Sequence, residues 1–569
     1  EALWRRPADC VFNDDAQVLW IANRGAGSMT RFDAIDWQPG GEFQLGRSLV
    51  DLEPVPNQPQ LVLSLDSAAN ELLLIDTASD SPQVLSRCSV APYSRRIAVS
   101  ADGGTAYVTS LWSQALTVVR IDPTYVGEGV LEPEQAVATS RLTVAQTVPL
   151  PFYADQLLPL PEHGKVLIAD AFRARLAIVA ADTLQVEAIR EFPGHNIRTL
   201  ALSRDGERLL VVQQHLNTKA QADFDDVTWG ILLFNGVRSL SLARVLDPTA
   251  DLLDDNRGIA LGMAEDHAGD PGMLVQTPTG RMAAVLTGSG AVAVGTDRFD
   301  LRPVEVGRHP VAAVFSPDEK LLFVVNEFSD SVSVIDTGKS VLLREVPLGP
   351  PAELTAAQRG ELLFFDARLS LDRWMSCNSC HTFGHSVDEL VDTLGDGDYG
   401  APKRIPSLLG IGDTAPHAWN GSLPDLEDQV RKSVRSTMHG APLSDDQVHD
   451  LAAYLRSLKL PEVNAFVDPK ARDGLVEAGR VVFETQRCHK CHVPPLYTSP
   501  QVYDVGLVDE SGRSEFNPPS LRGVSLRQRW LHDGRASRLE DVWEVHGHFP
   551  QSPLSPEDSA ALLAFLRSL

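Results

Sequence analysis

Four of the six cysteines lie in two short motifs with the same spacing, each followed at once by a histidine. The motifs consist of Cys377, Cys380 and His381, and of Cys488, Cys491 and His492. This spacing is the attachment signature of c-type haem, because each thiol adds to a vinyl group and the next imidazole ligates the iron. The sequence therefore predicts two covalently bound haem c groups. The alternative, one zinc held by the four thiolates, leaves both histidines without a role.

The composition limits the partners of such a redox centre. A net charge of −26 over 569 residues disfavours nucleic acid, whose phosphates would be repelled, and suits a basic redox protein. No apolar run is long enough for a transmembrane helix. The sequence starts at Glu1 without a leader, and c-type haem is normally attached outside the cytoplasm. We therefore expect a processed periplasmic or extracellular protein.

Two cysteines, Cys10 and Cys88, lie outside the haem motifs. An oxidising compartment favours pairing of such thiols, so the sequence predicts a Cys10–Cys88 disulfide. Two unrelated buried thiols are the alternative.

The first part of the chain, residues 1–348, is built from a repeat. Its clearest copy runs from His309 to Thr337: an apolar strand, a Ser-Pro-Asp turn, a second apolar strand, and a third strand that ends in Asp-Thr. Related pieces recur every ~40 to 55 residues, the period of propeller blades with four strands each. The pattern resembles β-propeller repeats of the YVTN type. It predicts an all-β propeller of seven blades, with six or eight as alternatives.

Two polar segments, 216–230 and 247–275, interrupt the repeat. They are interpreted as long loops between strands, which usually carry contacts rather than core. We expect them to face the haem region or a protein partner of the propeller.

Helical patterns replace the strands near residue 349, and the remaining chain is itself duplicated. The predicted lobes are 349–460 and 461–569, each with a leading helix, a haem motif and a closing helix. Both closing helices begin with a serine that can cap the helix, Ser444 and Ser555. The sequence therefore predicts a mainly α domain of two cytochrome c-like lobes after the propeller.

Several motifs of this half are similar to those of one family. They are Glu361-Leu-Leu-Phe-Phe-Asp-Ala-Arg-Leu-Ser, the first haem motif, Arg404-Ile-Pro-Ser-Leu, Trp419-Asn-Gly, Pro518-Pro-Ser-Leu-Arg-Gly and Trp530-Leu-His-Asp-Gly. Residues 350–569 thereby resemble the bacterial dihaem cytochrome c peroxidase superfamily, which includes the enzyme that matures tryptophan tryptophylquinone in methylamine dehydrogenase. The resemblance implies electron transfer from the second haem to a reactive first haem.

The resemblance also assigns the second ligand of the second haem. The family places a methionine, and its methylamine-pathway relative a tyrosine, at the position occupied here by His546. We therefore expect His492 and His546 to ligate the second iron, with His548 as the competing ligand. Two histidines close both faces of an iron and suit electron transfer.

For the first haem, the resemblance implies an iron that is open or loosely capped. Gly397 stands where resting peroxidases have a closing histidine, and His439 stands where they have a catalytic glutamate. We expect His439 to act as the distal acid–base group, although a histidine there could instead ligate the iron. Trp419 matches the family tryptophan that relays charge between the haems. Calcium is not predicted, because Arg404 and Arg529 occupy the positions of its family ligands.

Three functions remain open at this point. The first is a peroxide-dependent oxidoreductase that takes electrons from a small redox protein. The second is an oxidase or oxygenase that uses dioxygen or peroxide on an organic substrate or a protein side chain. The third is a non-enzymatic electron carrier or haem sensor.

Overall fold

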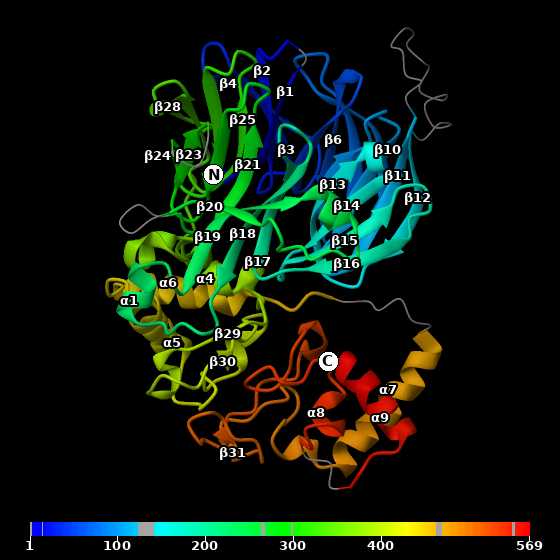
Figure 1. Cartoon of the computed structure of the whole chain (residues 1–569), viewed down its shortest axis with the longest axis vertical. Coiled ribbons are helices and arrows are strands. Elements are labelled where there is room, and N and C mark those ends of the chain that lie inside the picture. The colour runs from blue at the N-terminus through cyan, green and yellow to red at the C-terminus, as the bar shows by residue number, and fades with distance from the viewer. Residues whose placement is uncertain are drawn as a thin grey trace. The chain divides into compact units, whose positions relative to one another are not determined.

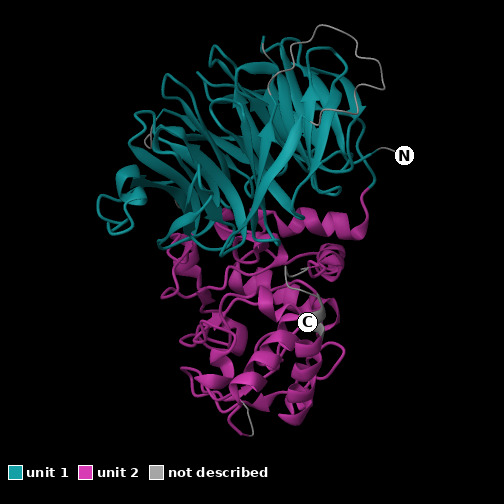
Figure 2. Ribbon diagram, turned by 90° about the vertical axis from the view of Figure 1, so that its right-hand side faces the viewer, with its two compact units in different colours: residues 1–214, 235–262, 268–353 teal, residues 215–234, 263–267, 354–569 magenta. Residues whose placement is uncertain are grey.

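The computed structural model describes residues 3–13, 15–122, 141–262, 268–296, 300–462, 469–548 and 552–569. The chain divides into two compact units, which Figure 2 distinguishes by colour. Unit 1 comprises described residues of 1–214, 235–262 and 268–353, and unit 2 comprises those of 215–234 and 354–569. Segment 215–234 thus belongs to the unit of the haem motifs. In the sequence, however, it connects two neighbouring strands of one sheet of unit 1.

Unit 1 is a propeller of seven antiparallel four-stranded sheets, as the sequence predicts (Figure 1). Each blade consists of four consecutive strands, and the first strand of each blade contacts that of the next, with β25 returning to β1. The blades are β1 Pro7–Phe12, β2 Val18–Asn23, β3 Ser28–Asp33, β4 Gln38–Gln44; β5 Leu49–Val55, β6 Gln58–Asp66, β7 Glu71–Asp76, β8 Gln83–Ser89; β9 Ser94–Val99, β10 Thr105–Ser110, β11 Ala115–Ile121, β12 Leu142–Pro149; β13 Ala154–Leu160, β14 Lys165–Asp170, β15 Arg175–Ala180, β16 Val186–Glu191; β17 His195–Leu202, β18 Arg208–Leu216, β19 Leu233–Ser241, β20 Arg257–Ala260; β21 Pro271–Gln276, β22 Met282–Leu286, β23 Ala291–Gly295, β24 Arg302–Glu305; and β25 Pro310–Phe315, β26 Leu321–Asn326, β27 Ser331–Asp336, β28 Val341–Pro347.

The clearest copy of the sequence repeat forms strands β25, β26 and β27. The Ser316 hydroxyl donates to Asp318 at 2.7 Å and closes the predicted turn. Strand β26 is buried on both faces, because neighbouring blades pack against each of them. This burial explains why its sequence is a continuous apolar run instead of an alternating one.

The ring closes through charges as well as apolar packing. The backbone amides of Arg5 and Arg6 donate to the Asp330 carboxylate at 2.9 and 2.8 Å. Glu327 is buried and receives the guanidinium groups of Arg6 and Arg24 at 2.9 and 3.2 Å. Burial alone would raise the pKa of Glu327, but Arg24 and Arg6 lower it to about 2. First and last blades are thereby joined by a carboxylate that stays ionised.

The predicted Cys10–Cys88 disulfide is absent, since both thiols are free. Cys10 lies on β1 and packs into the cluster between the first and last blades. Cys88 lies on β8, the outer strand of the second blade, and packs against a different cluster. The two thiols therefore belong to separate cores, as in the alternative of two unrelated thiols.

Unit 2 holds the helical lobes and a few short elements. Its helices are α1 Phe224–Thr228, α3 Ala356–Phe364, α4 Cys377–Cys380, α5 Leu426–Lys432, a π-helical turn Ser433–Thr437, α6 Asp445–Ser457, α7 Pro469–Thr485, α8 Asp541–Glu544 and α9 Pro556–Arg567. Two-stranded ribbons pair β29 Leu390–Val391 with β30 Lys403–Arg404 and β31 Tyr503–Asp504 with β32 Glu515–Phe516. A further short helix, α2 Leu242–Leu246, lies in the fifth blade of unit 1.

The duplication predicted from the sequence is visible in how the long helices cross. Helix α3 packs on α6 in the first lobe, and α7 packs on α9 in the second. A Cβ atom at Gly360 would overlap the Asp450 carbonyl, and one at Gly479 would overlap that of Ala561. Each leading helix therefore needs glycine where it meets the closing helix. The closing helices begin at their predicted serine caps, Ser444 and Ser555.

Among the described residues, no helix is both long and apolar enough to cross a membrane.

Candidate haem sites

The cysteines of the first motif lie on a short helix, α4, whose N-terminus is capped by Ser376. In α4 the Ser376 side chain accepts from the Asn378 amide, and the Ser379 hydroxyl accepts from the Ser376 amide, both at 3.0 Å. Cys377 and Cys380 lie three residues apart on this helix and so face one side. The His381 amide then donates to the Cys377 carbonyl at 2.9 Å, and His381 lines the same cavity as both cysteines.

The second motif repeats this geometry on a 3₁₀ turn, Cys488–Lys490. The His492 amide donates to the Cys488 carbonyl at 3.0 Å, as in the first motif. Burial raises the pKa of the Cys488 thiol to about 11. Each motif thus presents two thiols outside any disulfide, together with one imidazole, on a single short turn.

Each motif histidine is oriented by a backbone carbonyl. His381 Nδ1 lies 3.0 Å from the Pro406 carbonyl, and His492 Nδ1 lies 3.1 Å from that of Tyr497. Burial lowers the pKa of each imidazole to about 4. A neutral ring that donates through Nδ1 keeps its Nε2 lone pair for a metal, which is the usual arrangement of a ligating histidine.

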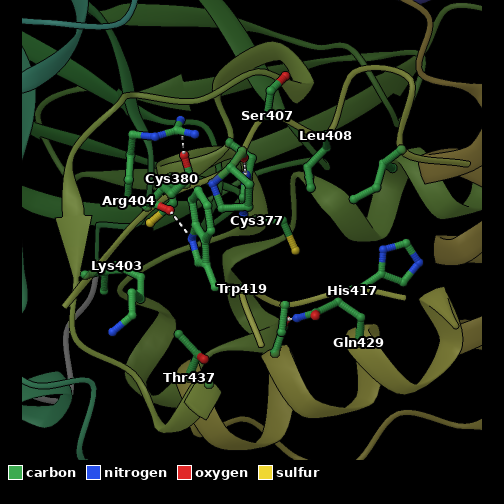
Figure 3. Close-up of a pocket in the computed structure, with 18 of the residues that line it drawn as sticks. Cys377, Cys380, Lys403, Arg404, Ser407, Leu408, His417, Trp419, Gln429 and Thr437 are labelled. Atoms are coloured by element: carbon green, nitrogen blue, oxygen red, sulfur yellow. Dashed lines mark hydrogen bonds between the residues drawn. The ribbon is translucent and has the colours of Figure 1, made fainter. Parts of the chain in front are cut away.

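His381 opens onto a cavity of about 330 Å³, called cavity 1 here. Its wall includes both thiols of the first motif, the indole of Trp419 and one face of the helix that runs from α5 into the π-helical turn (Figure 3). Apolar side chains supply much of the remaining wall; they include Met375, Leu408, Ile411, Val434, Met438, Leu451 and Leu455. Cavity 1 thus combines the groups that attach haem with apolar side chains that can pack against a porphyrin ring.

A polar stripe crosses this apolar wall. Gln429, Ser433 and Thr437 follow each other at four-residue spacing and all line cavity 1. The Gln429 side-chain amide donates to Ser433 Oγ at 2.9 Å. The stripe ends in a π-helical turn, a feature that often marks functional sites. These side chains can hydrogen-bond a small polar ligand inside cavity 1.

The structure places His439 outside the wall of cavity 1, contrary to the distal role predicted for it. The π-helical turn ends at Thr437, and His439 adopts a φ of 50°, which turns the backbone away. Its Nε2 lies 2.9 Å from the Ala222 carbonyl, and its ring meets Phe224 edge-on at 6.3 Å. The preceding residue, Met438, lines cavity 1 instead of His439. The predicted acid–base role does not fit this geometry.

His439 contacts a segment that is inserted between β18 and β19 of the fifth blade. We call residues 215–234 the strap. The Ala222 amide donates to the Asp392 carbonyl at 2.7 Å, and Tyr399 OH donates to the Ala222 carbonyl at 2.9 Å. The Trp374 indole donates to the Thr228 carbonyl at 3.1 Å. Three strap leucines line cavity 1; they are Leu216, Leu232 and Leu233. The segment expected to face the haem region thus forms part of the first site.

His492 opens onto a second cavity of about 320 Å³, cavity 2. Its wall includes both thiols of the second motif and His548, whereas His546, the predicted ligand, is not part of it. His548 is close enough to His492 to lower the pKa of that residue, after the larger effect of burial. Gly547, with a φ of 64°, turns the chain between the two histidines and directs the later one inward. The geometry therefore favours the competing ligand, His548.

The two cavities share a wall. Residues that line both are Arg404, Trp419, Asn517, Pro518, Pro519 and Arg527. The Trp419 indole donates to the Arg404 carbonyl at 2.9 Å, and its ring meets His532 of cavity 2 edge-on at 6.4 Å. Trp419 thus lies where a side chain could couple the two sites electronically.

The comparisons with known proteins agree with this arrangement. A family model described as di-haem cytochrome c peroxidase matches residues 355–461. Residues 355–461 are therefore similar to the di-haem cytochrome c peroxidase family. The match contains the first haem motif, Trp419 and the polar stripe.

Three curated relatives are similar to a larger share of the chain than the family model. Cytochrome c551 peroxidase of Pseudomonas aeruginosa is 24% identical over 39% of this chain and 80% of its own length. Cytochrome c551 peroxidase of Nitrosomonas europaea is 22% identical over 44% of this chain and 92% of its own. Methylamine utilization protein MauG of Methylorubrum extorquens is 27% identical over 37% of this chain and 76% of its own.

Arg404 is held by direct hydrogen bonds within unit 2. Arg404 is 2% exposed and donates to Asp388 at 3.0 Å and to the Leu531 carbonyl at 3.2 Å. Its guanidinium lies over the Trp419 ring at 5.5 Å. Arg404 therefore ties the first lobe to the second through direct bonds.

Two features of the site were not predicted from the sequence. The polar stripe could have been found from its four-residue spacing on a helix whose neighbours Val430 and Val434 are apolar. The strap contacts join residues that are far apart in the sequence. The local sequence pattern of the strap therefore indicates only a polar loop.

Proposed function

We propose that this protein is an extracytoplasmic dihaem c-type oxidoreductase that reduces peroxide. Cys377 and Cys380 would hold the first haem, and Cys488 and Cys491 the second, with His381 and His492 as axial ligands. When bound, these haems supply one-electron redox chemistry and, at an open iron, activation of peroxide.

One observation carries the proposal: each haem motif opens onto its own cavity, and a single tryptophan lies in the wall between them. Two attachment motifs alone would suit any multihaem cytochrome. Two cavities joined through Trp419 suit an enzyme in which one site collects electrons and the other uses them. The names of the curated relatives, cytochrome c551 peroxidase among them, support the same function.

The second site is proposed as the electron-transfer centre. His492 and His548 would both hold the iron, and a haem with two histidine ligands would supply electron transfer instead of substrate binding. Trp419, which contacts residues of both cavities, would relay electrons towards the first site.

The first site is proposed as the place where peroxide reacts. The stripe of Gln429, Ser433 and Thr437 would hydrogen-bond peroxide, and Met438 and the strap leucines would exclude bulk water. His439 would act as a positioning residue, since its ring holds the Ala222 carbonyl of the strap. We infer that its removal alters access to cavity 1 more than proton transfer within it.

The runner-up is an oxidase or oxygenase that acts on an organic substrate or a protein side chain. The observation that favours it is Gly397, a residue without a side-chain ligand where resting peroxidases carry a closing histidine. A site that is open at rest needs no reductive activation before an oxidant binds. A pure electron carrier or haem sensor would instead require a second protein ligand on the first iron.

Partners and location follow from the proposed chemistry. Haem c attachment normally takes place outside the cytoplasm, so we propose a periplasmic or extracellular protein. An electron donor with a basic face would suit the net charge of −26. The propeller would offer a further docking surface for a protein partner.

Turnover separates these functions. The purified dihaem protein should consume hydrogen peroxide with a reduced small cytochrome as electron donor. With organic electron donors, peroxide or dioxygen should be consumed more slowly. Faster turnover with organic donors than with the cytochrome would favour the oxygenase. No turnover with any donor, in a protein that carries both haems, would leave only the carrier or sensor.

A further inference from the structure

Two arginines, Arg404 and Arg527, lie in the wall that cavities 1 and 2 share, and the nearby carboxylate of Asp388 is bonded to Arg404. Asp388 accepts from Arg404 through one oxygen at 3.0 Å and from the Gln528 amide through the other at 2.8 Å. Both oxygens of this buried carboxylate are thereby engaged. Arg404 thus has a carboxylate partner, whereas among the described residues no such bond is formed by Arg527.

Arg527 has few partners of its own. Its Nη2 donates to the Ser520 carbonyl at 2.7 Å, and its enclosed Nε has no hydrogen-bond partner in the part of the chain that the structure describes. Burial, and then the charge of Arg404, lower the pKa of Arg527 to about 9, so it stays charged at neutral pH. An enclosed guanidinium with unused donors calls for an anion.

The position of Arg527 indicates which anion that is. Arg527 lines both cavities, and its charge acts on His492 of the second site. Any haem c brings two propionate carboxylates, and a guanidinium fork matches a carboxylate through paired hydrogen bonds. We propose that Arg527 binds a propionate carboxylate of the second haem and thereby raises the reduction potential of that haem. This inference rests on the proposed dihaem function.

The charged and titratable groups near Arg527 are engaged with other partners. They are Arg404, Asp388, His385 and His492. Asp388 is already committed to Arg404, and His385 is held between Ser407 and the Leu526 carbonyl at 2.9 and 3.1 Å. Among the described residues, no carboxylate remains to neutralise Arg527.

The test compares R527Q with R527K and with a control two residues away, R529Q, whose side chain lines neither cavity. Each full-length protein is first assayed for two bound haems, and the potentials are then measured by optical redox titration. R527Q should make reduction of the second haem about tenfold less favourable, a shift of ~59 mV, because the ferrous form loses a nearby positive charge. R527K should restore at least half of this shift, and R529Q should match the wild type.

A structural role alone would not move the propionate bending bands in the resonance Raman spectrum, whereas loss of the guanidinium contact should. An unchanged second-haem potential in R527Q, or an equal shift in R529Q, would overturn the proposal. If R527Q does not retain both haems, R527K decides, because its bending bands must differ from those of the wild type. A wild-type protein without two covalent haems would instead defeat the proposed function.

Discussion

The strap makes a sharp prediction, because the Trp374 indole is one of the groups that hold it beside the first haem motif. Trp374 is 5% exposed, donates to the Thr228 carbonyl at 3.1 Å, and packs so closely on Gly230 that a Cβ atom there would clash with its ring. Trp374 is also part of the apolar cluster that contains Cys377 and Met438. The change W374F removes the hydrogen bond and part of this packing while keeping an aromatic ring.

The expected cost follows from these contacts. A lost hydrogen bond that leaves a partly buried carbonyl unsatisfied costs about 1–3 kcal/mol. If the strap must move for a bulky ligand to enter cavity 1, its open population should rise roughly 5- to 150-fold. The binding rate of imidazole to the ferric first haem should rise by a similar factor. Cyanide, which is smaller, should gain less.

The assay is stopped-flow mixing of the ferric protein with each ligand, followed at the Soret band. The propeller variant W112F is a control for the general loss of a tryptophan, since Trp112 packs edge-on against Tyr153 and at a tilt against Phe172 in unit 1. Imidazole rates in W374F within twofold of the wild type would refute the idea that the strap controls access. An equal rise of the imidazole rate in W112F would show that the effect does not arise at the strap.

Three further predictions follow. H548A should convert the second haem from low spin to high spin in the EPR spectrum, whereas the matched change H546A should not; the reverse pattern would restore the assignment made from the sequence. D388N should lower the stability of unit 2 by about 3–5 kcal/mol in urea unfolding, because it leaves Arg404 buried without its partner; a loss below about 1 kcal/mol would contradict this. Glu327 has a pKa lowered to about 2, so its contribution of about 3 kcal/mol should be present above pH ~4.5 and be lost as the pH falls towards 2. E327Q should flatten this acid dependence of propeller unfolding, and an unchanged pH profile would refute the ion-pair account.

The propeller and the haem motifs could be predicted because their signals are local. Blade strands appear as short apolar runs between turns such as Ser316–Asp318, and a haem motif is defined by the spacing within five residues. Gly360 and Gly479 occupy equivalent positions in the two lobes, so the duplication could also be predicted from the sequence. These features depend on neighbours in the sequence.

The details of the sites depend on single backbone angles and on distant contacts. The resemblance assigns His546 as a ligand, but the positive φ of Gly547 directs His548 inward. The resemblance also assigns a distal role to His439, but the positive φ of this residue and its contact with the strap carbonyl take its side chain out of the wall. The strap itself is fixed by contacts with Trp374 and Tyr399, which no local pattern contains.

The central claim is that the two haem sites are unequal, one closed by two histidines and one open to peroxide. The EPR spectrum of the ferric protein tests it most directly. We predict one low-spin signal from the second haem and one high-spin signal from the first, with only the high-spin signal lost on adding cyanide. Two low-spin signals that cyanide leaves unchanged would contradict the account.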